Sequence, residues 1–207
     1  TLLTFGGAYS NHIAAVAAMG KEYGFKTIGI IRGEELVDKV SSNATLSFAK
    51  SCGMLFYFIS REEYRKKNEL FFSENLKSIY GDFYVLPEGG TNEFAVKGCA
   101  EILTNKDTSF NYVCSSVGTG GTIAGLIKSS NALQTVLGFS ALKGTFQTSY
   151  INEFTRKKNY KILDDYCFGG YAKVNTELIE FMNDFKNKTA VSLDPIYTGK
   201  MIFGIFD

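Results

Sequence analysis

The chain has 207 residues, of which 45% are hydrophobic and 21% are charged. This balance is typical of a globular protein with one large domain or two small ones. The net charge is only +1, so no basic excess is available to bind a nucleic-acid backbone. The longest apolar stretch, around residues 53–59, is far shorter than the roughly 20 residues that cross a bilayer. We therefore expect neither a nucleic-acid partner nor a membrane partner.

The cysteines and the histidine restrict the chemistry. Four cysteines without a CxxC pair indicate free thiols in a reducing compartment, so we expect a cytoplasmic protein. His12 is the only histidine, which excludes a multi-histidine metal site and allows a Ser-His-Asp triad only with His12 as its base. We predict no metal site.

Short β-branched or aromatic runs alternate with segments of helical periodicity, which predicts an α/β fold built on open parallel sheets. The predicted strands cover residues 2–5, 27–31, 54–59, 83–86, 112–115 and 135–139. The predicted helices cover residues 11–23, the stretch after possible caps at 41–43 up to 51, 61–77, 93–103, 123–128 and 175–185. Because residues 54–59 are continuously apolar, we expect a central strand covered on both faces. Between Ala141 and the last helix the pattern is weak.

The segment Pro87–Asn92 is the strongest break in the pattern, since it carries one of only two prolines and two adjacent glycines. It predicts two domains, a smaller α/β domain over residues 1–88 and a part of a larger domain over residues 89–207. The chain opens on an apolar, strand-like run and closes on residues 201–207 without a polar tail. We therefore expect it to be truncated at both ends, with further strands of the larger domain before residue 1 and after residue 207.

Three segments could bind an anion or carry chemistry. Residues Gly118–Thr122 (GTGGT) join a strand to a helix, so backbone N–H groups and two hydroxyls could hold a phosphate at the positive end of that helix. Residues Gly6–His12 (GGAYSNH) form a second strand-turn-helix of this kind. Residues Asp194–Lys200 (DPIYTGK) supply a phenol and a hydroxyl after an expected strand. Each segment also has a purely structural interpretation, as a glycine turn, a helix cap or a proline turn.

These motifs, with PEGGTNE at Pro87–Glu93, occur in an order that resembles one family, the pyridoxal-phosphate (PLP) enzymes that include D-cysteine desulfhydrase and 1-aminocyclopropane-1-carboxylate (ACC) deaminase. The resemblance spans nearly the whole chain. It implies the two-domain fold of the tryptophan synthase β-subunit, PLP fold type II, with a smaller domain, a larger cofactor-binding domain and the cofactor in the cleft between them. It also implies a homodimer and a small amino acid as the substrate.

The resemblance also assigns roles to residues of this chain. Asn11 would hydrogen-bond the phenolic oxygen of PLP, and Ser10 would meet the substrate carboxylate or act at the reacting carbon. The substrate-binding residues would thus be Ser10, Asn11 and His12. The loop of Gly118, Thr119, Gly120, Gly121 and Thr122 would hold the phosphate, Thr198 would face the pyridine nitrogen, and Tyr197 would transfer a proton. A phenol, whose ordinary pKa is about 10, needs a charged neighbour to ionise at neutral pH.

Two features set this chain apart within the family. The true deaminases have a glutamate after the tyrosine, whereas this chain has Thr198, which favours D-cysteine desulfhydrase-type β-elimination over ACC ring opening. No lysine here lies in a Schiff-base motif, so we expect that lysine upstream of Thr1. The first hypothesis is a PLP-dependent lyase or deaminase that yields a 2-oxo acid and ammonia. The alternative is a non-catalytic relative that binds PLP or phosphate.

Overall fold

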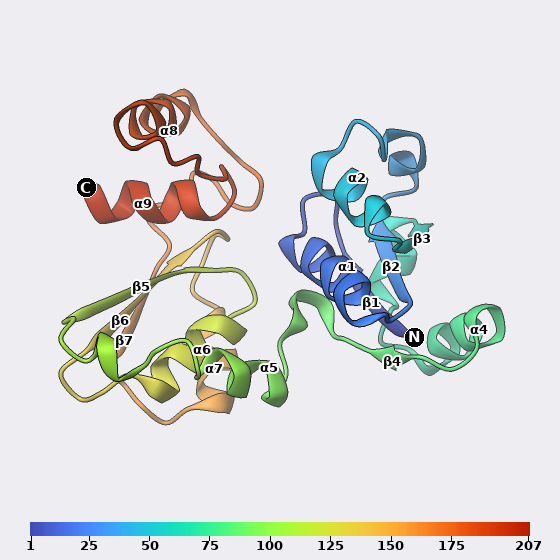
Figure 1. The fold of residues 1–207 in the computed structure, drawn as a ribbon, viewed down its shortest axis with the longest axis horizontal. Coiled ribbons are helices and arrows are strands. Elements are labelled where there is room, and N and C mark those ends of the chain that lie inside the picture. Colours follow the sequence, from blue (N-terminus) through green and yellow to red (C-terminus); the bar gives the residue numbers. More distant parts are fainter. The chain divides into compact units, whose positions relative to one another are not determined.

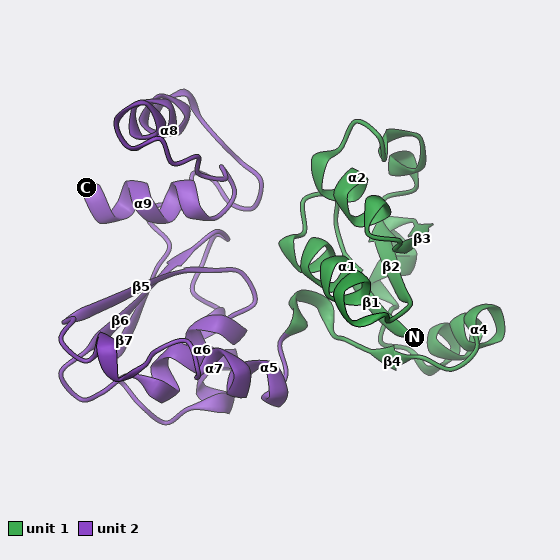
Figure 2. Ribbon diagram, in the orientation of Figure 1, with its two compact units in different colours: residues 1–90 green, residues 91–207 purple.

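A computed structural model describes all 207 residues, and they form two compact units, residues 1–90 and 91–207 (Figure 2). The division follows Gly90, two residues after the predicted one. Each unit has its own parallel sheet. No helix is long and apolar enough to cross a membrane.

Unit 1 is built on a four-stranded parallel sheet with the order β3-β2-β1-β4 (Figure 1). Its strands are β1 (Leu2–Gly6), β2 (Thr27–Arg32), β3 (Leu55–Ile59) and β4 (Tyr84–Val85). Its helices are α1 (Asn11–Tyr23), α2 (Ala44–Ser51), α3 (Arg61–Arg65), α4 (Leu70–Tyr80) and the 3-10 turns η1 (Glu34–Lys39) and η2 (Glu88–Gly90).

Successive side chains of a strand point to opposite faces of the sheet, and those of β1 and β2 are buried on both faces. Helices therefore cover both faces of this sheet. On one face Ile31 of β2 packs with Ile13 and Ala17 of α1 and with Leu46 of α2. On the other face β1, β2 and β3 contribute a cluster with Tyr64 of α3 and Leu76 of α4; its strand members are Leu3, Phe5, Ile28, Ile30 and Ile59. Helix 11–23 is confirmed at both ends.

Two predictions for unit 1 are wrong. Residues 55–59 form an edge strand rather than a central one, and Leu55 is 57% exposed. The run is apolar because half-buried aromatic rings make up its centre, and composition alone does not separate these from fully covered residues. The single helix expected over 61–77 is two helices. Tyr64 and Leu76 belong to one cluster, yet twelve residues at 3.6 per turn would place them about 120° apart on one straight helix.

Unit 2 is built on a three-stranded parallel sheet with the order β5-β6-β7 (Figure 1). Its strands are β5 (Tyr112–Val117), β6 (Thr135–Ser140) and β7 (Tyr160–Leu163). Its helices are α5 (Glu93–Cys99), α6 (Gly121–Ser129), α7 (Gln147–Phe154), α8 (Thr176–Thr189), α9 (Thr198–Phe206) and the 3-10 turn η3 (Asn105–Asp107).

Helix α6 and Ile151 of α7 pack on one face of this sheet, where Val117 and Val136 complete the core. Helix α9 contacts β5 and β6, and α8 packs against α9. Strand β7 and helix α7 lie in the stretch where the sequence pattern was weak. The strand expected before Asp194 is absent: residues 191–194 have no regular secondary structure, turns follow at residues 195–197, and α9 begins at Thr198.

Candidate functional site

The glycine loop between β5 and α6 has the features of an anion site. Gly120 is the N-cap of α6 and has a φ of 99°, a conformation that favours glycine. Because Gly120 has no side chain, no side-chain oxygen caps this helix. The first backbone N–H groups of α6 have no partner within the helix, and they point outward at its positive end. An anion would satisfy them.

Thr91 contacts the glycine loop, and the sequence analysis did not predict this contact. Its hydroxyl lies 2.6 Å from the Thr119 hydroxyl. A Cβ on Gly121 would come within 2.8 Å of the same Thr91 oxygen, so the close approach requires glycine at position 121. Thr91 thus holds the Thr119 hydroxyl and packs against Gly121. The signal was present in PEGGTN, where Thr91 follows two glycines.

Asp194 organises the turn that carries Tyr197. One carboxylate oxygen accepts the N–H groups of Ile196 and Tyr197, both at 2.9 Å. The other accepts the N–H of Thr198 at 2.9 Å and its hydroxyl at 3.0 Å. The turn is rigid as a result, and the hydrogen of the Thr198 hydroxyl is engaged by a carboxylate.

Tyr197 lies beside the glycine loop. A Cβ on Gly118 would be 3.4 Å from Cε1 of Tyr197 and 3.8 Å from its hydroxyl oxygen. The structure therefore brings two of the predicted motifs together within unit 2. A second phenol, that of Tyr171, packs edge-on against Tyr197 with ring centroids 6.2 Å apart. Tyr171 was not predicted, although the Gly169-Gly170 pair before it marks a tight turn.

The other predicted residues lie at the start of α1 in unit 1. Ser10 is the N-cap, and its hydroxyl accepts the N–H of Ile13 at 3.3 Å. Asn11 is exposed at the first position of the helix. A Cβ on Gly6 would be 2.9 Å from Ser10 Oγ, so glycine there lets the helix start approach the end of β1.

His12 is held by a buried threonine. Nε2 of His12 lies 2.7 Å from the hydroxyl oxygen of Thr4, which donates to the carbonyl of Leu86 at 3.0 Å. Since the single hydroxyl hydrogen goes to Leu86, the imidazole is the donor and carries its proton on Nε2. Burial lowers the pKa of His12, and the carboxylate of Glu88 opposes this in part. His12 is therefore neutral at pH 7.

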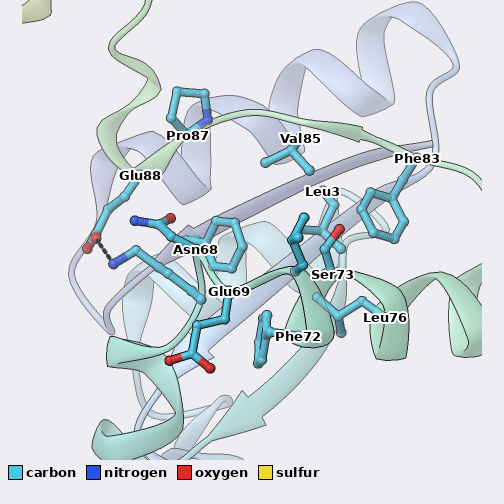
Figure 3. A pocket seen from close by; sticks show the side chains of 13 residues that line it. Leu3, Asn68, Glu69, Phe72, Ser73, Leu76, Phe83, Val85, Pro87 and Glu88 are labelled. Atoms are coloured by element: carbon cyan, nitrogen blue, oxygen red, sulfur yellow. Dashed lines mark ion pairs between the residues drawn. The ribbon is translucent and has the colours of Figure 1, made fainter.

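A pocket of about 350 Å³ opens on the α4 side of unit 1 (Figure 3). Apolar side chains that include Leu3, Phe72 and Phe83 line it, and so do Lys67 and Glu88, which form an ion pair 3.2 Å long. None of the predicted site residues lines it. Of the motif segments, only the one at Pro87–Glu93 reaches the pocket, through Pro87 and Glu88.

Known proteins resemble this chain along its whole length. No family model matches it. A protein of Thermotoga maritima, provisionally named a 1-aminocyclopropane-1-carboxylate deaminase, is 29% identical over all of this chain and 72% of its own length. A bifunctional D-cysteine desulfhydrase/1-aminocyclopropane-1-carboxylate deaminase of Arabidopsis thaliana is 27% identical over all of this chain and 58% of its own. The resemblance predicted from the motifs is confirmed.

A solved structure agrees. The crystal structure of an ACC deaminase homologue superposes with a TM-score of 0.80, at 26% identity, over 99% of this chain and 67% of that one. The predicted fold class, an open α/β fold of the PLP fold type II, is confirmed.

The residues of unit 2 fit the phosphate of PLP. The α6 N-terminus lacks a side-chain cap, and the close approach at Gly121 leaves no room for a side chain. In the neighbouring turn, the carboxylate of Asp194 is bonded to three backbone N–H groups and the Thr198 hydroxyl. The glycine loop is therefore the part of this chain best suited to a phosphate dianion.

Proposed function

We propose that this protein is a PLP-dependent lyase or deaminase acting on a small amino acid, with D-cysteine as the first substrate and ACC as the second. The observation that carries the proposal is the position of the Tyr197 phenol beside an uncapped, glycine-rich helix N-terminus. The relatives that match the whole chain bear the names of both activities. A phosphate cradle beside a proton-transfer group is the minimum that such chemistry needs from unit 2.

Each residue would have one task. The N–H groups of residues 119–122 and the hydroxyls of Thr119 and Thr122 would bind the phosphate, and Thr198 would face the pyridine ring. When bound, PLP withdraws electrons from the substrate and makes its Cα–H acidic. Tyr197 would take up or deliver a proton at the reacting carbon. Asn11 would contact the cofactor, and Ser10 with His12 would bind the substrate carboxylate.

The overall reaction on D-cysteine balances with water as the only co-reactant. The Cα–H proton leaves, the Cβ–S bond breaks with its electron pair on sulfur, and water releases the nitrogen. The products are pyruvate, ammonia and hydrogen sulfide. Thr198 supports this elimination over ring opening, because its neutral hydroxyl does not keep a pyridine nitrogen protonated as a carboxylate does.

The test uses the full-length protein loaded with PLP. Sulfide and pyruvate are measured with D-cysteine, and 2-oxobutanoate is measured with ACC. We expect sulfide release, and we expect Tyr197→Phe and Ser10→Ala each to lower kcat about 10²-fold or more while the cofactor absorbance stays in place. Unchanged rates in both variants would refute the assigned roles.

A second candidate function is a non-catalytic relative that binds PLP or phosphate, because none of the lysines in this chain lies in a Schiff-base motif. Borohydride reduction of the PLP-treated full-length protein, followed by peptide mass mapping, separates the two. A pyridoxyl group on a lysine supports the enzyme. Folded protein that binds PLP without an adduct, and that produces neither sulfide nor 2-oxo acid, supports the alternative.

The homodimer stays a prediction from the resemblance, and light scattering tests it. The cytoplasmic location rests on the cysteines, all four of which are free thiols.

A further inference from the structure

Lys200 is the largest side chain that the structure buries completely, with 1% of its surface exposed. Its ammonium donates to the carbonyl oxygens of Cys167 at 2.7 Å and Gly170 at 2.8 Å. No carboxylate lies within ion-pair distance of it. Burying a cation against neutral carbonyls is costly, and an apolar side chain of the same length would fill the space without that cost. The hydrogen bonds to the two carbonyls therefore explain why a charged side chain occupies this buried position.

These carbonyls belong to a strained segment, residues 167–172, here called the tyrosine loop. Four of its six residues have a positive φ: Phe168 (50°), Gly169 (87°), Gly170 (117°) and Ala172 (56°). Two of the four are not glycines, and such residues keep this conformation only where the surroundings impose it. The two bonds from Lys200 constrain this loop strongly, since each is assisted by a full charge.

The tyrosine loop carries one of the two phenols of the site. Its Tyr171 packs edge-on against Tyr197, which lies one turn before Lys200 at the start of α9. At the other end of the loop, the Phe168 ring packs edge-on against Phe203 of the same helix, with centroids 5.0 Å apart. The loop thus touches α9 through two aromatic contacts, and the ammonium of Lys200 joins it to the helix between them.

We infer that Lys200 is a positioning residue, which fixes the strained tyrosine loop on α9 and so holds the Tyr171 phenol against Tyr197. Lys200 acts through the backbone of residues 167–170, because its ammonium donates to the carbonyl oxygens of Cys167 and Gly170. The inference rests on the proposed function only for its effect on turnover; the effect on the loop is independent of it.

The variant that tests this is Lys200→Met, which keeps the length and apolar stem but removes the charge and the donors. The matched control is Lys173→Met, which removes an exposed lysine just after the loop. Hydrogen exchange by mass spectrometry is measured on peptides that cover residues 167–172. We expect exchange about tenfold faster in Lys200→Met and unchanged in Lys173→Met. Equal exchange in all three proteins would overturn the inference.

Turnover supplies a readout that a merely structural role would not move. We expect Lys200→Met to lower kcat about tenfold with KM changed little, because the phenols are displaced while the binding groups stay. In a Tyr171→Ala background, where no ring remains to be held against Tyr197, the same change should lower kcat by less than twofold. A full additional loss in that background would overturn the positioning role. If the wild-type protein turns over no amino acid, the proposed function fails, and the exchange comparison still decides whether Lys200 holds the loop.

A measurement on the wild-type protein covers the case in which Lys200→Met does not fold. In protein labelled with ¹⁵N-lysine, we expect one ammonium signal whose protons exchange slowly with water, since the group is buried and bonded to two carbonyls. Lysine ammonium protons that all exchange at the fast rate of exposed groups would contradict the inference.

Discussion

The hydroxyl of Thr4 accepts a hydrogen bond from His12 and donates one to the carbonyl of Leu86, so a single buried oxygen joins the start of α1 to the end of β4. Thr4 has no exposed surface. This relay needs a proton on Nε2 of His12, and burial, which lowers the pKa of His12, favours the neutral tautomer that carries it there. Both residues are therefore coupled to the stability of unit 1.

The first prediction concerns pH. His12 has a lower pKa in the folded chain than its ordinary value of 6.5, so the unfolded state binds more protons below that value. The contribution of His12 to stability is complete above pH 6.5, falls as the pH drops through the folded pKa, and is then lost. Urea unfolding between pH 5 and 8 should show a falling midpoint on the acid side. His12→Gln should reduce this slope, and an identical slope in the variant would contradict the role of His12.

The second prediction concerns the hydroxyl of Thr4. Thr4→Val keeps the shape but leaves the imidazole N–H and the Leu86 carbonyl without their partner. We expect a loss of about 1–3 kcal/mol in the free energy of unfolding. Thr4→Ser keeps the hydroxyl and should lose less. Denaturant titration measures both, and equal losses would show that packing, rather than the relay, determines the effect.

The third prediction concerns the contact between α5 and α6. A Cβ on Gly125 would lie 2.5 Å from Cβ of Cys99, so Gly125→Ala forces two helices apart and should cost about 1–3 kcal/mol. Gly98→Ala, in α5, meets nothing within 4 Å and should be neutral or stabilising by up to about 1 kcal/mol. The melting temperature should therefore fall in Gly125→Ala and stay the same or rise in Gly98→Ala, each relative to wild type.

The fourth prediction concerns the glycine loop. Thr91→Val removes the partner of the Thr119 hydroxyl, and we expect PLP affinity to fall about 2–10-fold. Thr91→Ser should retain most of the affinity. Titration by cofactor fluorescence measures both values without any need for turnover. If Thr91→Val binds PLP as tightly as wild type, Thr91 does not support the phosphate site.

The sequence predicted those elements whose structure is determined by residues close together in the chain. Helix 11–23 could be read from its apolar face and its capping residues, and Ser10 is the N-cap of that helix. The glycine loop at 118–122 and the break near residue 90 were recognisable because glycine and proline restrict the backbone wherever they occur. Local chemistry was sufficient at each of these positions.

The remaining features depend on contacts between distant residues. The break between α3 and α4 lets Tyr64 and Leu76 pack in the same cluster. The edge position of β3 follows from the order of the strands in the sheet. Lys200 lies next to an apolar run in the sequence. Only the structure shows that its ammonium binds carbonyl oxygens some thirty positions earlier in the chain. The sequence by itself determined the fold class, the family resemblance and the positions of the glycine-rich turns. Only the tertiary structure decided which side chains meet at them, because burial and pairing are set by residues far apart in the chain.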